Sequence, residues 1–450
     1  EPGFMGQQKM NNGMYAPGYA FAFGIQDPNI LQNALDNGWL NGNDSIVNPA
    51  TTAFTSDFDI KASIEPIPGL KIDVSGKRYI ASNTTVQYMF DGMPSTFTGS
   101  YNITLMALST AFKPIGTAEQ NYNSDVFQTF LDNRKVIKDR LNKSFNNKNV
   151  PTYGFMKDNK FTNSELIEKP RLDNTTGFNE NSADVLIPSF LAAYTGRDVN
   201  SVDTNPFLSL LSILPNWRIS YDGLSRIGWI KDHFKSISVT HAYTCRYSIG
   251  SYTSYSTWVA MGGDNSALGY VRDVQTNIPI PSSPYDISNI SLTEQFSPLI
   301  GVNVAMNNSM TGKLEYRKQR NLALNLSSTQ LIEAATDEFV VGLGYLLKDF
   351  DVILKLKNQT QTSVKNDLKL SADLSYKDIK TLLRKVDSNI TQASSGNKLF
   401  TLKIIADYVF SSKLNIQLFY DKQSSSPLIS SSYPVSSTNF GMSFKFMLTR

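Results

Sequence analysis

The chain has 450 residues, of which 41% are apolar, 11% aromatic and only 18% charged, with 42 basic and 39 acidic side chains. A soluble protein carries about a quarter charged residues, so neutral polar residues fill the deficit, as they do in the lumen and loops of a membrane β-barrel. The balanced charge gives no electrostatic footprint for nucleic acid, and a single cysteine with two histidines excludes a disulfide framework and a Cys/His zinc site.

The first part of the chain is rich in turn residues. Residues 1–54 contain Gly-Gln-Gln, Asn-Asn-Gly and Pro-Gly stretches without a clear period, so we expect an irregular, loop-rich segment. The chain begins at Glu1 with neither an initiator methionine nor a signal peptide, and we therefore expect an interior or C-terminal piece of a longer protein.

Strands of a membrane barrel are expected over residues 55–112. Runs near 55–65 and 70–80 alternate apolar and polar residues, which is the period of a β-strand, and a Pro-Ile-Pro-Gly turn separates them. Two further strands are expected near 84–91 and 99–112.

Residues 113–215 have helical spacing instead. Ser124 is placed as an N-cap, and apolar residues follow it every three or four positions in a charged background. Two more helical stretches are predicted at Ile187–Tyr194 and at Phe207–Leu214, the second bounded by prolines. We expect a small folded insert, which would plug the barrel, cap it or form a surface domain; the spacing does not separate these alternatives.

Barrel strands are expected to resume at 216–261, near 235–249 and 252–261, before a long Gly-, Asn-, Pro- and Ser-rich loop at 262–297. Residues 298–450 carry the strongest alternation. Ten strands are predicted there, near 298–307, 310–318, 320–328, 338–347, 350–357, 367–376, 378–386, 398–410, 413–421 and 439–449.

The predicted connectors of this region alternate in length, with short ones at residue 319, Lys348-Asp349, Lys377 and 411–412. Outer-membrane barrels have short periplasmic turns and longer external loops. The 411–412 turn is therefore expected to face the periplasm, and the chain would end at the periplasmic rim.

Alternation also assigns the two faces of the predicted wall. Lipid is expected to contact Phe400, Leu402, Ile404, Tyr408, Leu414, Ile416, Leu418, Phe444 and Phe446. Lys369, Asp373, Lys403, Asp407, Asn415 and Lys445 are expected to face the lumen. The terminal run Phe440, Met442, Phe444, Phe446 and Leu448 resembles the C-terminal signal of barrel assembly.

Nothing in the chain predicts catalysis or a cofactor. The glycines in Gly342-Leu343-Gly344 lie within an apolar alternating run, without the third glycine and helix of a phosphate loop. No nucleophile elbow, Walker lysine or histidine beside a nucleophile is present. We therefore do not expect an enzyme.

The stretches PGFMGQ at 2–7 and YAPGYAFAFGIQD at 15–27, together with the terminal strand series, resemble the C-terminal part of the SprA/Sov family. That family forms the outer-membrane translocon of the type IX secretion system, which is linked to gliding motility. The resemblance implies one side of a very large single-chain barrel that exports folded cargo proteins, with a PorV-type partner barrel and a periplasmic plug protein.

Two other classes of protein remain open from the sequence. One is a smaller outer-membrane solute channel or receptor, in which the 113–215 insert would be a plug. The other is a secreted adhesion protein of packed β-sandwiches, which would dissolve without detergent.

Overall fold

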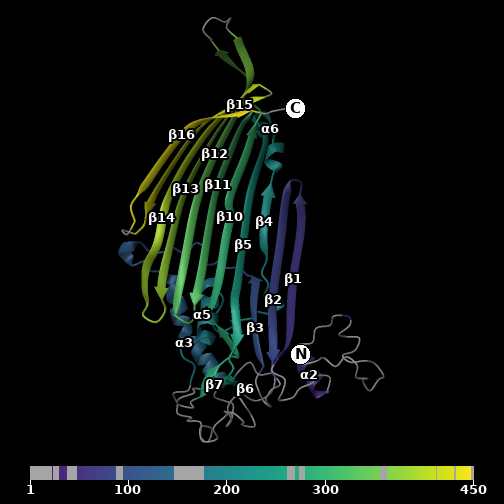
Figure 1. The fold of residues 1–450 in the computed structure, drawn as a ribbon, viewed down its shortest axis with the longest axis vertical. Coiled ribbons are helices and arrows are strands. Elements are labelled where there is room, and N and C mark those ends of the chain that lie inside the picture. Colours follow the sequence, from purple (N-terminus) through teal and green to yellow (C-terminus); the bar gives the residue numbers. More distant parts are fainter. Residues whose placement is uncertain are drawn as a thin grey trace.

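The computed structural model describes residues 23, 30–37, 48–87, 95–145, 177–260, 269–272, 279–354, 362–411, 413–429 and 432–446. Most of these residues form one antiparallel sheet of 13 strands, and a second sheet has 3 short strands (Figure 1). We call the large sheet the wall. Its strands are β1 (Ala50–Ile67), β2 (Leu70–Val86), β3 (Thr96–Thr104), β4 (Asn216–Tyr221), β5 (Phe234–Ser254), β9 (Tyr285–Ile287), β10 (Asn289–Met306), β11 (Met310–Asn325), β12 (Gln330–Leu354), β13 (Thr362–Lys385), β14 (Ile390–Ser411), β15 (Leu414–Pro427) and β16 (Val435–Phe446).

The remaining elements are short strands and helices. The small sheet contains β6 (Trp258–Ala260), β7 (Gly269–Arg272) and β8 (Pro279–Ser282). The α-helices are α2 (Ile30–Asp36), α3 (Asp125–Phe145), α5 (Ala183–Thr195) and α6 (Gly228–His233), and the 3-10 turns are η1 (Ala118–Gln120), η2 (Leu210–Ser212) and η3 (Gly223–Arg226). No helix of the described residues is both long and apolar enough to cross a membrane.

The wall is built from hairpins that follow the chain. The strand order runs β1-β2-β3-β5 and then β10 to β16 in sequence, so β1 and β16 form its two outer edges (Figure 1). The expected alternating segments do form an antiparallel sheet. The described residues show this sheet as an open wall, and closure of a barrel stays a prediction.

The C-terminal strands are longer and fewer than the sequence predicted. From residue 289 the wall has seven strands, β10 to β16, because the predicted turns at Gln319 and Lys377 lie inside β11 and β13. A single residue cannot reverse a chain, since hairpin loops need at least two. Lys348-Asp349 is a bulge in β12, where the register with β13 shifts and Asp349 has φ 53°.

Other predicted boundaries also moved. The first strand starts at Ala50, inside the segment expected to be irregular, and the predicted pair at 235–249 and 252–261 is mostly one strand, β5. The loop expected at 262–297 contains β7, β8 and β9 and the start of β10. Prolines and glycines in this segment hid strands that are only three or four residues long.

The insert leaves the wall at one strand position, between β2 and β5, which β3 and β4 share. Both β3 and β4 pair antiparallel with β2 and with β5, β3 lower and β4 higher in the same column (Figure 1). The chain therefore steps out of the wall after Thr104 and returns at Asn216. The insert spans 105–215, eight residues more at its start than the sequence predicted, because β3 ends at Thr104 instead of residue 112.

Polar side chains satisfy the backbone where this column is interrupted. The Thr104 hydroxyl accepts a hydrogen bond from the Lys77 backbone N–H (3.1 Å), and the Asn216 side-chain oxygen accepts one from the Cys245 N–H (2.7 Å). The Leu105 N–H donates to the Cys245 carbonyl (3.1 Å). These bonds replace the missing ladder bonds, since an unpaired buried N–H is costly.

Two of the three predicted helices of the insert are present. In α3 the Ser124 hydroxyl accepts from the Phe127 N–H, as expected of an N-cap, and α5 covers the predicted stretch from residue 187 to 194. The third stretch contains only the 3-10 turn η2, because eight residues between two prolines make an α-helix of marginal length. The apolar faces of α3 and α5 pack together and onto the wall as one core.

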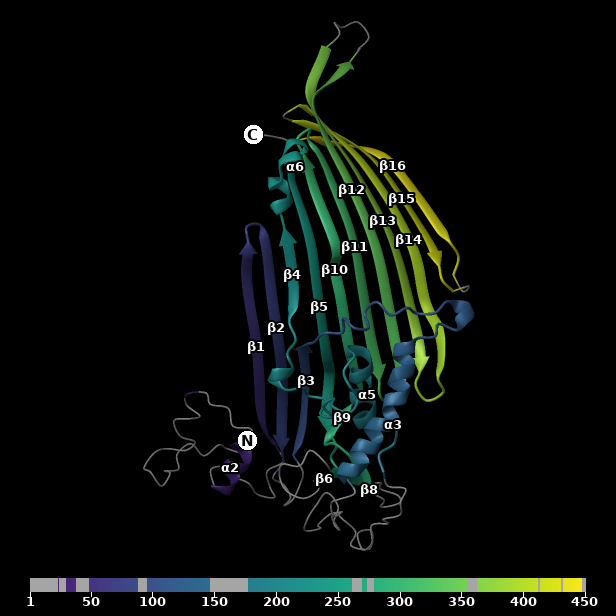
Figure 2. The ribbon, with the colours of Figure 1, turned by 180° about the vertical axis from the view of Figure 1, so that it is seen from behind.

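The helices cover only one face of the wall, and only towards one end. Figure 2 shows α3 and α5 in front of the lower parts of β5 and β10 to β13, at the end opposite the C-terminus. The turn between β14 and β15 lies at the same end as the C-terminus (Figure 1).

Candidate functional site

The register sorts the side chains of the wall into two surfaces. Directly paired residues on neighbouring strands share a face, and successive residues alternate between faces. Leu402 lies opposite Leu374, whereas the next residue, Lys403, lies opposite Asp373. An apolar pair and a charged pair therefore emerge on opposite sides of the same two strands.

This sorting groups the predicted residues as the alternation did. One face carries Phe400, Leu402, Ile404, Tyr408, Leu414, Ile416, Leu418, Phe440, Met442, Phe444 and Phe446. The other carries Lys369, Asp373, Lys403, Asp407, Asn415 and Lys445. We call them the apolar face and the polar face. Whether the first contacts lipid and the second a lumen stays a prediction, and Leu448 lies outside the described residues.

The apolar face begins with a row of rings that crosses four strands. Tyr316 of β11 lies opposite Phe339, Phe339 opposite Tyr376, and Tyr376 opposite Phe400. Towards the C-terminal end of the wall, the rows that follow up to Phe446 of β16 are mainly aliphatic or aromatic, although Lys422 of β15 and Thr438 of β16 lie in the row of Leu402. Exposed members include Leu314, Leu343, Ile404, Leu418, Met442 and Phe444. We call this region, from the ring row to Phe446, the apolar band.

The height of the band can be taken from one strand. Phe400 and Phe410 lie ten residues apart in β14. At roughly 3.4 Å per residue and a strand tilt of roughly 40–45°, that length spans about 25 Å, the height of the apolar band of outer-membrane barrels.

One predicted member departs from the expectation. Tyr408 is buried, its ring packs edge-on against Phe350, and its hydroxyl donates to the Phe350 carbonyl (3.4 Å). The bulge at 348–349 brings β12 over this position, which sequence alternation alone could not show.

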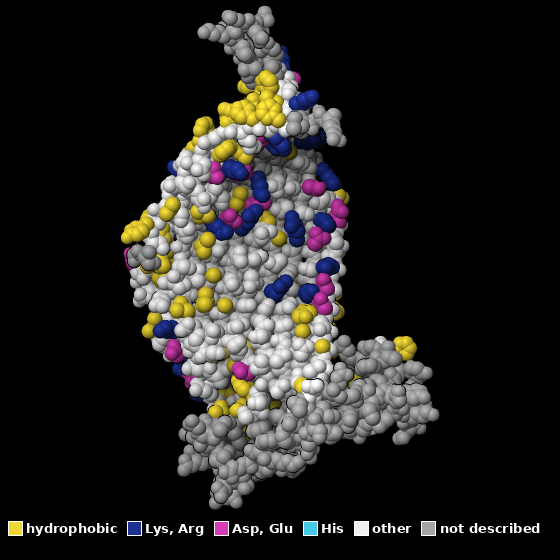
Figure 3. Space-filling model, in the orientation of Figure 1, with side chains coloured by type: hydrophobic (Ala, Val, Ile, Leu, Met, Phe, Trp, Pro, Cys, Tyr) yellow, Lys and Arg dark blue, Asp and Glu magenta, His cyan; other side chains and the backbone are white. Residues whose placement is uncertain are grey.

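The polar face carries charges of both signs. Figure 3 shows basic and acidic side chains distributed over the face turned away from the helices. In the centre of the wall, Glu315 is paired with Lys313 (3.1 Å) and Arg317, and Arg317 with Glu338 (3.2 Å). Asp57 and Asp59 of β1 form exposed ion pairs with Lys77 and Lys61 as well.

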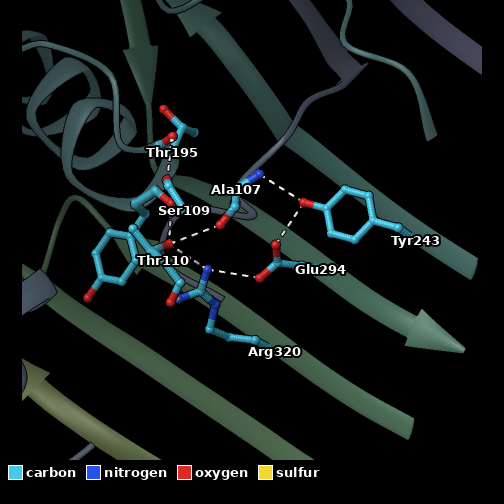
Figure 4. Close-up of polar contacts among 8 residues, drawn as sticks. Ala107, Ser109, Thr110, Thr195, Tyr243, Glu294 and Arg320 are labelled. Carbon is cyan, nitrogen blue, oxygen red and sulfur yellow. Dashed lines mark hydrogen bonds and ion pairs between the residues drawn. The ribbon is translucent and has the colours of Figure 1, made fainter. Parts of the chain in front are cut away.

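The insert is attached to the wall by a buried polar cluster (Figure 4). The Tyr243 hydroxyl donates to Glu294 (2.7 Å), and Arg320 donates to Glu294 (2.9 Å) and to the Thr110 hydroxyl (2.8 Å). The Ala107 N–H in turn donates to the Tyr243 hydroxyl (2.8 Å). Thr110 and Ala107 belong to the insert, so the cluster fixes its first segment to β5, β10 and β11.

A second buried ion pair holds the far side of the insert. Arg384 of β13 is fully buried and donates to Glu333 of β12 (2.7 Å) and to the Tyr122 carbonyl of the insert (2.9 Å). Its guanidinium also lies 5.2 Å from the centre of the Phe127 ring of α3. Sequence reasoning missed both clusters, although a signal existed: each of these charges falls in phase with apolar positions of its strand.

The insert and the apolar band share one face. In β12, Glu333 and Leu343 are an even number of residues apart with no register shift between them, so both side chains emerge on the same side. The same holds for Arg384 and Leu374 in β13. Because Glu333 and Arg384 lie beneath the insert, it packs on the side of the apolar band.

No group of side chains that could hold a metal ion is found among the described residues. No protein-family model matches the chain, and no curated protein sequence matches it either.

Proposed function

We propose that this chain forms part of the wall of a large outer-membrane β-barrel that serves as a passive protein-conducting pore. The proposal includes the translocon of the type IX secretion system, with secreted proteins as cargo and a PorV-type barrel and a periplasmic plug as partners. For this last step its support is the resemblance of the chain to the SprA/Sov family.

The observation that carries the membrane assignment is the apolar band. Leu343 is 58% exposed in its centre, and exposed apolar side chains extend from strand to strand across the wall. Monomeric soluble proteins rarely expose contiguous apolar patches beyond a few hundred Å². A band of about 25 Å in height with a charged opposite face fits a wall between lipid and water.

The position of the insert argues against a plug. If the apolar band faces lipid, the insert on that same face lies outside the barrel wall, beyond one edge of the band. Of the three alternatives for the insert, a surface domain is therefore favoured. The turns at 68–69 and 307–309, of two and three residues, lie at the opposite end, whereas those at the insert's end, such as 326–329 and 386–389, have four. We therefore assign the insert's end to the cell exterior.

The composition of the polar face favours a polypeptide over a selected ion or solute. Its charges alternate in sign, as in the row that joins Asp373, Lys403 and Asp421 across three strands. A pore lined in this way has little net field, and neither cationic nor anionic cargo is excluded. A solute channel is the second candidate, and in that case the whole protein would be about as long as this chain.

The proposal is tested by the mass of the native polypeptide and by the proteins that co-purify with it. Outer membranes are extracted with mild detergent, and the polypeptide that contains this sequence is purified and its mass determined. A translocon requires a chain several times longer than this one together with a second barrel protein. A chain of this length without a partner would favour a solute channel, and release without detergent would contradict the membrane assignment.

A further inference from the structure

We propose that the insert contacts the membrane surface itself, through an apolar edge that dips into the lipid interface beside the wall. The inference rests on the proposed function, because it takes the apolar band as the lipid-facing part of the wall. The edge consists of Leu108, Phe112, Leu210 and Leu211, all of which are exposed. We call this set the apolar edge.

The most exposed large apolar side chain of the insert marks the edge. Leu211 is 96% exposed, and its neighbour Leu210 is 45% exposed. Both lie in the tight turn η2, and Leu208, two residues before the turn begins, is buried. The chain here sends Leu208 into the core and presents Leu210 and Leu211 outward, where contact with lipid would remove their apolar surface from water.

Two contacts place η2 against the apolar face of the wall, at β1, β2 and β3. The Leu214 N–H donates to the Thr104 carbonyl, where the chain re-enters the wall. A Cβ on Gly76 would lie 2.7 Å from Ile213 and 3.2 Å from Ile60 of β1, so Ile213 approaches the wall at Ile60. Ile60 is 54% exposed on the apolar face, and Leu211 is only two residues from Ile213.

A third contact places Phe112, in the other half of the apolar edge, close to the ring row. The ring of Phe112 lies 5.2 Å from that of Phe296 in β10. Four residues further along β10, on the same face, is the exposed Ile300, which lies opposite Tyr316 of the ring row. Phe112 thus lies beside the first row of the band, with Lys113 next to it in sequence and also exposed.

The chemistry of the edge fits a bilayer interface. Aliphatic and aromatic side chains enter the boundary between headgroups and acyl chains, and a neighbouring lysine extends to the headgroup phosphates. Rings at this level are the usual feature of membrane interfaces, and Trp217, stacked on Tyr243 at 4.6 Å, lies in the same row of the wall as Phe296, the ring that Phe112 contacts.

Site-directed spin labelling in the full-length protein tests the contact. Cys245, the only cysteine, is buried, so an introduced cysteine is the accessible thiol. The variants are Leu211→Cys in the apolar edge, Leu343→Cys in the band and Lys135→Cys on the exposed side of α3. Each labelled protein is placed in phospholipid vesicles, and its collision rates with oxygen and with a water-soluble nickel complex are compared.

Labels at 343 and 211 are expected to favour oxygen, and the label at 135 is expected to favour nickel. A label at 211 that resembles the one at 135, while 343 stays lipid-exposed, overturns the inference and leaves the proposed function intact. The inference is also overturned if the label at 211 is shielded from both reagents, as in a protein contact. A water-exposed label at 343 contradicts the membrane assignment and the inference with it.

Discussion

Leu402 and Lys403 are neighbours in β14, yet they belong to opposite surfaces: Leu402 lies opposite Leu374 and Lys403 opposite Asp373. In the proposed wall, one step along the backbone thus separates hydrocarbon from water. Every polar group of the backbone between them is paired with the adjacent strands, as a membrane-embedded sheet requires.

The centre of the apolar band should be the least tolerant of charge. Ile404 lies midway between the ring row and the opposite end of the band, and it is exposed. Ile404→Arg is expected to lower the free energy of unfolding in bilayers by about 2–4 kcal/mol, whereas Ile416→Arg, nearer the rim, should cost about 0–1 kcal/mol. Denaturant titration in vesicles measures both.

The matched control is the next residue of the same strand. Ile405 lies opposite Ser371 on the polar face. An arginine there can extend into water, so Ile405→Arg should be much less destabilising than Ile404→Arg. Equal costs at the two positions would mean that the faces do not differ in environment.

The buried ion pair Arg384–Glu333 should be required for docking of the insert. Arg384→Ala leaves Glu333 buried without its partner, which is expected to destabilise the docked insert by about 3–5 kcal/mol. Lys138→Ala, which breaks the partly exposed pair with Glu180, should cost at most about 1 kcal/mol. The two variants are compared by the protease sensitivity of the insert, measured at increasing denaturant concentration. A small effect of Arg384→Ala would show that apolar packing alone holds the insert.

The insert should lose stability as the pH rises from acidic to neutral, because of one carboxyl. Burial raises the pKa of Asp184, in the first turn of α5, above its usual value of about 3.9, although the Ser283 N–H donates to it. The folded state then keeps its proton to higher pH than the unfolded state does. The stability from this group is full below the unfolded pKa and is lost as pH rises through the raised one.

Asp184→Asn isolates this contribution. The amide oxygen can still accept from the Ser283 N–H but carries no charge at any pH. Thermal unfolding of the insert at a series of pH values should therefore vary less in the variant, and the variant should be the more stable protein at neutral pH. An unchanged pH profile would assign the dependence to another group.

Gly76 should be necessary for return of the insert to the wall. A Cβ at this position would lie 2.7 Å from the Ile213 side chain. Gly76→Ala is expected to destabilise the insert by about 1–3 kcal/mol through this overlap. Adding Ile213→Ala should recover much of that loss, since it removes the overlapping methyl groups. Calorimetry of the single and double variants decides, and a double variant no better than Gly76→Ala would contradict the contact.

The alternation of β14 and β15 predicted both their existence and the grouping of their faces, because period two is a direct consequence of strand geometry. Strand length was not predictable from the same signal. Lys377, which was predicted to be a turn, continues the alternation of β13. In the sequence, a charged residue on the polar face of a strand cannot be distinguished from a charged turn residue. The third predicted helix failed since apolar residues between Pro206 and Pro215 instead pack in an irregular return segment.

The docking of the insert could not have been predicted from local pattern. Glu294, Arg320 and Thr110 meet although Thr110 and Arg320 are 210 residues apart in sequence. A charge in an apolar phase shows that a buried partner must exist, but not where the partner is. For the same reason the sequence left open which face of the wall the insert covers.

The most direct test of the lipid-facing band is a scan of single cysteines through residues 401–407 of β14 in the full-length protein in vesicles. Each thiol carries an environment-sensitive fluorophore, and quenching by lipids brominated in their acyl chains is measured. The account predicts strong quenching at 402, 404 and 406 and weak quenching at 401, 403, 405 and 407. Uniformly weak quenching, or strong quenching at the odd positions, would contradict it.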